Sequence, residues 1–213
     1  MLLELNRIEV PPGQRILFNH ISWQEFERIL EELGEHRAAR IAYDNGTLEI
    51  MNPLPEHEDD KEIIGDLVKA LLEERDIEFR CLGSTTYKNV EMARGIEPDQ
   101  CFYIQNEIKI RGKKRLDLTI DPPPDLALEI DITSRTHPRI YQALGVPELW
   151  RFENETLQIN VLQDGQYQPS ERSSIFPDLP LKQAIAAFLQ QSRVIGRNAT
   201  LKAWRQWIRE QRS

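Results

Sequence analysis

The sequence has little cysteine: two residues in 213, Cys81 and Cys101, which form no spaced motif. A zinc site or a disulfide framework would need spaced cysteine pairs, so we expect two buried free thiols in a reducing compartment. No apolar run approaches the ~18 residues needed to span a bilayer. The amino terminus lacks the basic start and apolar stretch of a signal peptide. We therefore expect a soluble, cytoplasmic protein with no membrane contact.

The sequence also lacks an excess of basic residues. It has 27 lysines and arginines against 35 acidic residues, which gives a net charge of −8. A protein with a broad basic face for nucleic acid usually shows it in the total charge. Either nucleic acid is not the partner or the basic residues are concentrated locally. The segment 193–213 meets the second condition, because it has six basic residues and one acidic residue, Glu210.

The same carboxy-terminal segment has a helical pattern. Leu201, Trp204, Trp207 and Ile208 recur at spacings that place them on one face of a short helix. We expect one domain over 1–192, followed by a basic amphipathic helix or tail over 193–213. Two alternatives stay open: the tryptophans dock on the chain or on a symmetry partner and the arginines are solvated, or the helix also presents its basic face to a phosphate backbone.

Length and composition indicate a globular domain with a substantial core, since 40% of the residues are hydrophobic and 29% are charged. Apolar spacing and turn residues divide the chain into helical and extended segments. We expect helices near 22–34, 56–75, 140–144, 181–190 and 200–209, a hairpin of 39–43 with 47–51, and strands near 78–82, 85–89, 96–104, 125–132, 149–153, 157–163 and 167–169. This order predicts an α/β (mixed α+β) fold with one central mixed sheet flanked by helices.

The strongest strand candidate is Asp125-Leu-Ala-Leu-Glu-Ile-Asp-Ile132. Side chains alternate between the two faces of a strand, so its leucines and isoleucines point one way and Asp125, Glu129 and Asp131 the other. Three carboxylates on one face repel one another unless water or a cation neutralises them. A water-facing edge and a cation site are both compatible with this strand taken alone.

Two more acidic segments accompany it. Pro98-Asp99 begins a strand in which Asp99 shares a face with Cys101 and Tyr103, although Pro-Asp is also typical of a turn. Glu58 lies in the first turn of the helix expected from residue 56, where acidic residues complement the helix dipole whatever else they do. Carboxylates gathered from two strands and a helix would supply the oxygen ligands that Mg²⁺ prefers.

Together these segments resemble the PD-(D/E)XK restriction-endonuclease-like nucleases, with Pro98-Asp99 and Glu129-Ile130-Asp131 at the signature. Longer stretches resemble the Uma-type family of proposed endonucleases, long catalogued as a domain of unknown function. These stretches are Pro55-Glu-His57-Glu58, Pro124-Asp-Leu-Ala-Leu-Glu-Ile-Asp-Ile-Thr-Ser134 and Tyr141-Gln-Ala-Leu-Gly-Val-Pro-Glu-Leu-Trp150. The likeness covers roughly residues 20–190.

The resemblance implies a restriction-endonuclease-like core, in which a mixed sheet lies between helices and the site holds Mg²⁺ or Mn²⁺. Asp99 and Glu129 match the two metal-binding carboxylates of the superfamily. Glu58 matches an acidic residue often found on the preceding helix. These three residues are therefore the expected metal ligands.

One position departs from the superfamily pattern. The residue two after Glu129 would be a lysine that orients the attacking water, and here it is Asp131. Other members of the Uma-type family carry a lysine a few residues later, and whether His137 or Arg139 replaces it stays open. Because Asp131 is expected to face an open polar site, a lysine there should be tolerated.

Two functions from different classes follow. The first is a metal-dependent DNA endonuclease that hydrolyses phosphodiester bonds, with Glu58, Asp99, Glu129 and Asp131 as its catalytic residues. The second is a catalytically decayed member of the fold that acts as a nucleic-acid-binding or assembly module. DNA is the expected partner, and a homodimer is an open alternative.

Overall fold

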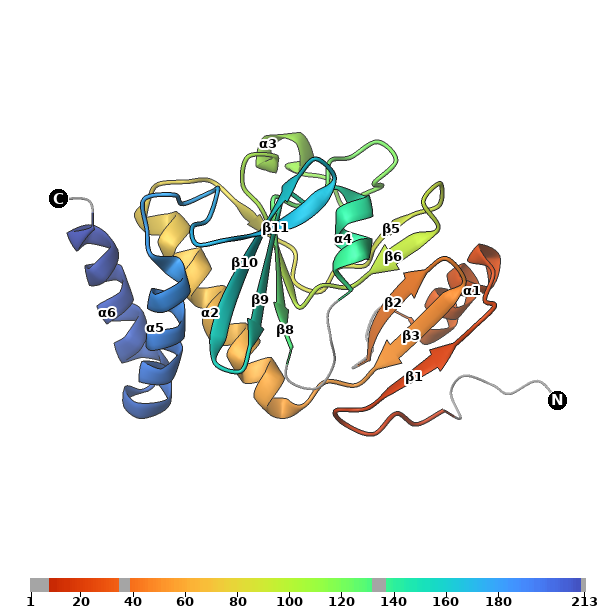
Figure 1. The fold of residues 1–213 in the computed structure, drawn as a ribbon, viewed down its shortest axis with the longest axis horizontal. Helices are drawn as coiled ribbons and strands as arrows, with labels where there is room; N and C mark the ends of the chain where they lie inside the picture. Colours follow the sequence, from red (N-terminus) through yellow and green to blue (C-terminus); the bar gives the residue numbers. More distant parts are fainter. Residues whose placement is uncertain (1–7, 35–38, 132–136, 212–213) are drawn as a thin grey trace.

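The structure is a computed structural model that describes residues 8–34, 39–131 and 137–211. In these residues two β-sheets lie next to each other, and the helix α4 (Pro138–Leu144) packs between them (Figure 1). None of the helices described is both long enough and apolar enough to cross a membrane.

The first sheet is built from the amino-terminal part of the chain, and all of its neighbouring strands are antiparallel. The helix α1 (Trp23–Leu33) covers it and begins with the predicted capping box between Ser22 and Glu25. The predicted hairpin turn is also confirmed, because Asn45 and Gly46 have φ of 45° and 90°, as a two-residue Asn-Gly turn requires. The strand order is β1 (Arg15–Phe18), β3 (Thr47–Met51), β2 (Arg40–Asp44), β6 (Arg94–Ile96) and β5 (Tyr87–Asn89).

The second sheet has six strands and is mixed. β8 and β9 are parallel and are joined through α4, while the other neighbours are antiparallel. A crossover helix is the usual connection between parallel strands, because a tight hairpin cannot join them. The strand order is β11 (Gln166–Ser170), β10 (Thr156–Gln163), β9 (Glu148–Glu153), β8 (Leu126–Ile130), β7 (Gln100–Tyr103) and β4 (Arg80–Cys81), and a short helix, α3 (Glu107–Ile110), follows β7.

The predicted fold class is confirmed, but the expectation of one central sheet is wrong. The strand expected over 96–104 is divided, because β6 ends at Ile96 in the first sheet and β7 begins at Gln100 in the second. Pro98 lies in the break and has no N–H to donate to a strand ladder. The chain therefore passes from one sheet to the other at Glu97-Pro98-Asp99, which places both acidic residues at the junction.

The predicted alternation of β8 is confirmed. Leu126, Leu128 and Ile130 belong to the large core formed with α2 (Pro55–Glu74), α5 (Leu181–Ile195) and α6 (Arg197–Glu210). Ala127 points to the opposite face and packs in the core that contains α4. Because side chains alternate, Glu129 also lies on the α4 side, at the end of the strand nearest the junction.

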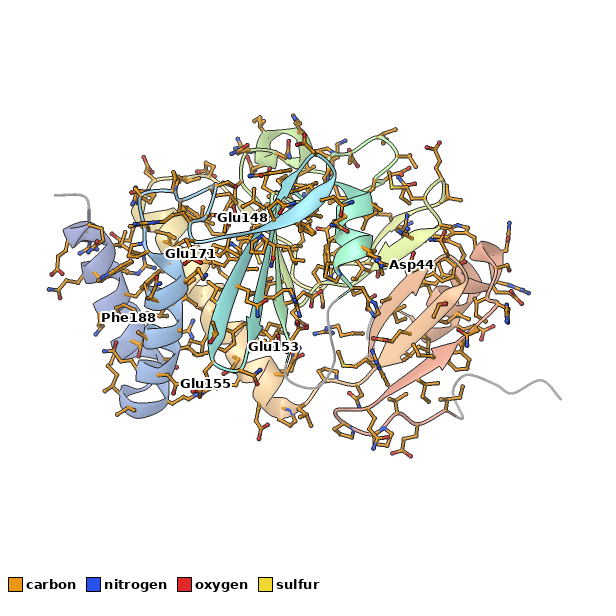
Figure 2. The ribbon with its side chains drawn as sticks, in the orientation of Figure 1. Asp44, Glu148, Glu153, Glu155, Glu171 and Phe188 are labelled. Atoms are coloured by element: carbon orange, nitrogen blue, oxygen red, sulfur yellow. The ribbon has the colours of Figure 1, made fainter. Side chains whose placement is uncertain are left out.

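The carboxy-terminal segment is part of the packed structure. Residue 193, where a separate tail was expected to begin, lies inside α5, and both α5 and α6 pack on α2 (Figure 1). Trp204 is fully buried and its Nε1 donates to the Leu67 carbonyl at 2.8 Å. Its ring stacks on Trp207 and meets Phe188 of α5 edge-on, with centroids 4.8 and 4.9 Å away. Phe188 is labelled in Figure 2. The alternative in which the tryptophans dock on the same chain is therefore confirmed.

The arginines of this segment pair with acidic residues spaced along α2. Because the four arginines of this segment that the structure describes each have a carboxylate partner, the structure does not support a face of free arginines that contacts a phosphate backbone. The ion pairs are Arg193–Asp60, Arg197–Asp66, Arg205–Glu73, Arg205–Glu74 and Arg209–Glu74.

The packing of α6 leads to a first prediction. Trp204→Ala should lower the free energy of unfolding by about 3–5 kcal/mol, because it empties a buried site and removes a hydrogen bond. Trp207→Ala removes a partly buried ring on the same helix and should cost about 1 kcal/mol, the usual size for a point substitution. Urea denaturation followed by circular dichroism measures both. Equal stability of the Trp204→Ala variant and the wild type would contradict the packing of α6 on α2.

Candidate functional site

Asp99 and Glu129 meet on adjacent strands. The antiparallel register of β7 and β8 pairs Gln100 with Leu128, so Asp99 lies opposite Glu129 one residue further along. Asp99 is only 3% exposed, and its Oδ2 accepts a hydrogen bond from the Ile130 N–H at 2.8 Å. The two carboxylates expected as metal ligands are therefore brought together by strand pairing.

Glu129 is held in place from the α4 side. The Tyr141 hydroxyl donates a hydrogen bond to Glu129 Oε1. Burial, followed by repulsion from Asp99, raises the pKa of Glu129 well above its ordinary value. Burial and the nearby Glu129 carboxylate also raise the pKa of Tyr141, so its hydroxyl keeps its proton and stays a donor. A cation next to Glu129 would favour its ionised form.

His57, in the first turn of α2, lies between two acidic residues. Its Nε2 is 2.9 Å from Asp99 Oδ2 and its Nδ1 is 3.5 Å from Glu58 Oε1, and the residue is nearly fully buried. Burial alone would lower the pKa of His57, but the carboxylates of Asp99 and Glu58 outweigh it and raise the pKa to about 9. The imidazolium therefore neutralises part of the acidic cluster.

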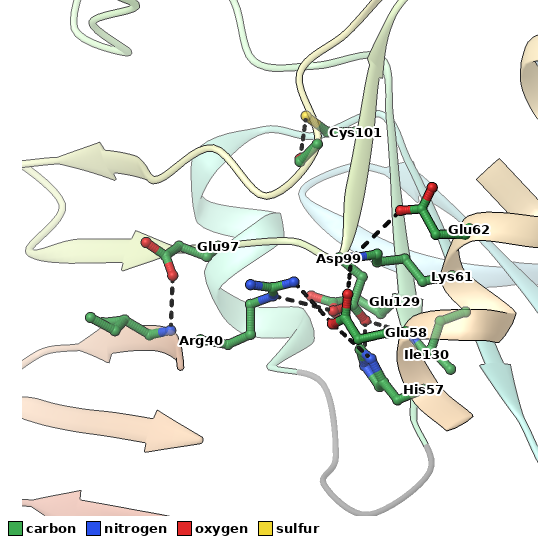
Figure 3. A network of polar contacts seen from close by, with 12 residues as sticks. Arg40, His57, Glu58, Lys61, Glu62, Glu97, Asp99, Cys101, Glu129 and Ile130 are labelled. Carbon is green, nitrogen blue, oxygen red and sulfur yellow. Dashed lines mark hydrogen bonds and ion pairs between the residues drawn. The ribbon is translucent and has the colours of Figure 1, made fainter. Parts of the chain in front are cut away.

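Glu58 is surrounded by positive charge. Arg40 Nη2 donates to its Oε1 at 3.1 Å and Lys61 Nζ donates to its Oε2. The contact with His57, reinforced by these two basic side chains, holds the pKa of Glu58 at about 2. Arg40 comes from β2 of the first sheet and also reaches toward Asp99, with Nε 3.7 Å from Asp99 Oδ1 (Figure 3).

These side chains line a small pocket at the junction of the two sheets. Its volume is about 40 Å³, which is room for an ion with a few waters rather than for a nucleotide. Five carboxylates line it, and among the residues described only one arginine and two histidines oppose them. The carboxylates belong to Glu49, Glu97, Asp99, Glu129 and Asp131, and the basic residues are Arg40, His57 and His137.

A family model, Uma2, described as "Putative restriction endonuclease", matches residues 23–190, well over half of the chain. The chain belongs to the Uma2 family. The expected resemblance is thereby confirmed, and the family's description supports a nuclease-like function with nucleic acid as the substrate. The comparison with curated proteins gave no match.

A solved structure supports the fold of this Uma2 chain. It is a crystal structure from Anabaena variabilis described as "a putative nuclease belonging to DUF820". The two structures superpose with a TM-score of 0.55 and share 15% sequence identity, over 78% of this chain and 97% of the other. At that identity the likeness concerns the fold alone, and it agrees with a restriction-endonuclease-like core.

Asp131, at the superfamily's lysine position, lines the pocket but is buried and paired there, rather than open as expected. Its side chain is buried, and Arg151 Nε donates to its Oδ2 at 2.8 Å. Arg151 is the parallel-strand neighbour of Glu129 on β9. A lysine in place of Asp131 would lose this ion pair and place two cations together, so the expectation that it would be tolerated is not supported.

The two residues considered as replacements for the superfamily's lysine, His137 and Arg139, lie in different surroundings. His137 lines the pocket, with Nε2 3.3 Å from Glu49 Oε2. Arg139 is exposed and does not line the pocket. Residues 132–136, which complete that stretch, lie outside the described part of the chain.

The donors around the pocket fit a hard divalent cation in their chemistry. Carboxylates held close together on neighbouring strands disfavour each other's ionised form, and a cation between Asp99 and Glu129 would remove that penalty. In the described residues no three acidic, histidine or cysteine side chains already form a ligand cage. The arrangement therefore offers two carboxylates directly, and Glu58 would have to leave its basic partners to become a third ligand.

The sequence alone did not identify Arg40, Glu49, Glu97 and Tyr141 as residues of the site. Glu97 could have been predicted from the sequence, because it lies two positions before Asp99 and side chains two positions apart share a face in an extended segment. Tyr141 and His57 appeared only within the stretches that resemble the Uma2 family. Arg40 had no local signal, because it reaches the pocket from a different sheet.

The burial of Asp131 gives a second prediction. Asp131→Lys should lower the free energy of unfolding by about 3 kcal/mol, because it breaks a buried ion pair and leaves Arg151 uncompensated. Glu171→Lys, which breaks the largely exposed pair with Lys182, is the matched control and should change stability by less than about 1 kcal/mol (Figure 2). Thermal and urea unfolding measure the difference. If both variants match the wild type, the Asp131–Arg151 pair contributes nothing to stability.

Proposed function

We propose that the chain is a divalent-metal-dependent endonuclease that hydrolyses phosphodiester bonds in DNA, and that Asp99 and Glu129 hold Mg²⁺ or Mn²⁺. The observation that carries the proposal is the meeting of buried Asp99 and partly buried Glu129 on neighbouring strands, inside a pocket large enough for an ion. Oxygen ligands suit both metals. Membership of a family described as restriction endonucleases supports nucleic acid as the substrate.

A divalent ion in this pocket would lower the pKa of a bound water and offset the charge that develops on the phosphate. The chain's own residues would hold the ligands in position for this. The Ile130 N–H and His57 fix Asp99 Oδ2, which directs Oδ1 toward the pocket. The Tyr141 hydroxyl fixes one oxygen of Glu129. Glu58, with its low pKa, stays ionised and holds the Arg40 guanidinium beside the pocket.

A second function is favoured by one specific observation. Asp131 occupies the lysine position and is paired with Arg151, and a carboxylate there cannot supply the positive charge that a lysine would offer a phosphate. A catalytically inactive member of the fold that binds nucleic acid, or assembles with other proteins, is therefore the alternative. Divalent-metal binding without DNA cleavage would favour it.

The third prediction tests cleavage. Purified wild-type protein should nick supercoiled plasmid DNA in the presence of Mn²⁺ or Mg²⁺ and not in EDTA. Asp99→Asn should lower the rate by about 100-fold or more, the effect expected when a charge-stabilising group is removed. The control is Glu62→Gln, which replaces an exposed carboxylate on α2 that lies 3.7 Å from Lys61 Nζ, and it should leave the rate within about twofold. Metal-independent nicking, or equal rates for the wild type and Asp99→Asn, would contradict the proposal.

The fourth prediction tests metal binding without activity. Saturating Mn²⁺ should raise the melting temperature of the wild type, because a ligand of the folded state stabilises it by about 2.7 kcal/mol at 100 times its Kd. For a chain of this size that corresponds to about 5–10 °C. The double variant Asp99→Asn, Glu129→Gln should lose the shift, because both proposed ligand carboxylates have been removed. A shift that survives in the double variant would show that the metal binds elsewhere.

A further inference from the structure

The pocket would repel a phosphodiester substrate, because both carry negative charge. Carboxylates dominate its lining, and a DNA phosphate brings another negative charge, which grows during hydrolysis. One divalent ion between Asp99 and Glu129 would offset two charges at most. A permanently charged donor on the protein, close to the ion but not bound to it, would help to bind the phosphate.

Arg40 is the only lysine or arginine that lines this pocket in the described part of the chain. Its side chain is 14% exposed, so it is largely removed from water. A guanidinium keeps its charge at every relevant pH and has five N–H donors in a planar fork that matches the oxygens of a phosphate. The histidines that share the lining have neither a fixed charge nor this geometry.

The donors of Arg40 are only partly used. Nη2 donates to Glu58, but the Nε–H is buried and has no hydrogen-bond acceptor in the described residues. Its nearest ion-pair partner, Asp99 Oδ1, is 3.7 Å away, which is beyond hydrogen-bond distance. A buried donor without an acceptor costs about 1–3 kcal/mol, so a ligand oxygen placed there would be bound favourably.

The other basic residues near the cluster already have carboxylate partners. Lys61 pairs with Glu58 and Glu62 and does not line the pocket. Arg151 pairs with Asp131 and lies 3.8 Å from Glu153. Among the lysines and arginines described, Arg40 is thus the one that both reaches Asp99 and has a donor without an acceptor (Figure 3).

We propose that Arg40 binds a non-bridging oxygen of the phosphate that is cleaved and supplies the positive charge that position 131 lacks. This inference rests on the proposed function and extends it. When Asp99 ligates a cation, Asp99 no longer attracts the guanidinium, and Arg40 turns its Nε–H to the phosphate oxygen. Because Arg40 belongs to β2, the first sheet supplies the phosphate-binding group and the second sheet supplies the metal ligands.

The fifth prediction compares Arg40→Gln, Arg40→Lys and the control Arg94→Gln in the full chain. Arg94 is in the same sheet, and its Nε contacts Asp44 at 2.9 Å, so its replacement also breaks an arginine–aspartate pair but away from the pocket. Plasmid cleavage at saturating Mn²⁺ gives kcat and KM, and titration calorimetry without DNA gives the Kd for Mn²⁺. Circular dichroism and melting temperature establish that each variant is folded.

Arg40→Gln should lower kcat by about 100-fold with a smaller change in KM, because the contact strengthens as charge develops on the phosphate. Its Mn²⁺ affinity should be equal or up to about threefold higher, since a cation next to Asp99 has been removed. Arg40→Lys should keep part of the activity, and Arg94→Gln should match the wild type.

Several results would overturn the inference. A kcat for Arg40→Gln equal to that of the wild type would overturn it and leave the endonuclease function intact. If Arg40→Gln weakens Mn²⁺ binding by the same factor as it lowers kcat, Arg40 only holds the metal ligands in position and does not bind the phosphate. If Arg40→Gln does not fold, Arg40→Lys decides the question, because a lysine has no Nε–H donor at that position: full activity would exclude the proposed phosphate contact, and a more than tenfold loss of kcat would support it. Absence of cleavage by the wild type would overturn the proposed function and this inference together.

Discussion

The site depends on the electrostatic cost of placing several carboxylates at the buried junction of two sheets. Asp99, Glu97 and Glu49 are each less than a tenth exposed, and Asp99 lies opposite Glu129. Such a cluster is stable only if positive charge compensates it. In the structure His57 and Arg40 provide that charge next to Asp99, and Arg15 and His137 provide it next to Glu49. The proposed metal would take over part of the role of His57 and Arg40. The carboxylates of the site therefore need positive charge twice: in the folded protein, where basic side chains supply it, and in the proposed reaction, where a metal ion would supply it.

The topology explains why the site is composite. The chain leaves the first sheet after Ile96 and enters the second at Gln100, so the Glu97-Pro98-Asp99 segment connects the two. Strand pairing with β8 then fixes Asp99 against Glu129, while α2 and β2 bring His57 and Arg40 from the two sides. The carboxy-terminal helices stabilise α2 through Trp204 and its arginine pairs, so they contribute to the site indirectly.

Much of the fold could be predicted from the sequence, because its signals are local. The capping box at Ser22, the Asn45-Gly46 turn and the alternation of β8 each depend on neighbouring residues, and each is confirmed. The division into two sheets was not predicted, because a continuous apolar segment does not reveal which strands pair with it. The place of Asp131 was misjudged for a similar reason: its partner, Arg151, lies on another strand. Whether Asp99, Glu129 and Glu58 bind metal stays a prediction.

The most direct test of the central claim is a crystal structure of the wild type soaked in Mn²⁺, with the metal located by its anomalous scattering. We expect one strong peak between Asp99 and Glu129, with a carboxylate oxygen of each residue at coordination distance and the Arg40 guanidinium turned away from Asp99. A peak coordinated only by other carboxylates, such as Glu49 and Glu97, or no peak in the pocket at saturating Mn²⁺, would contradict the account.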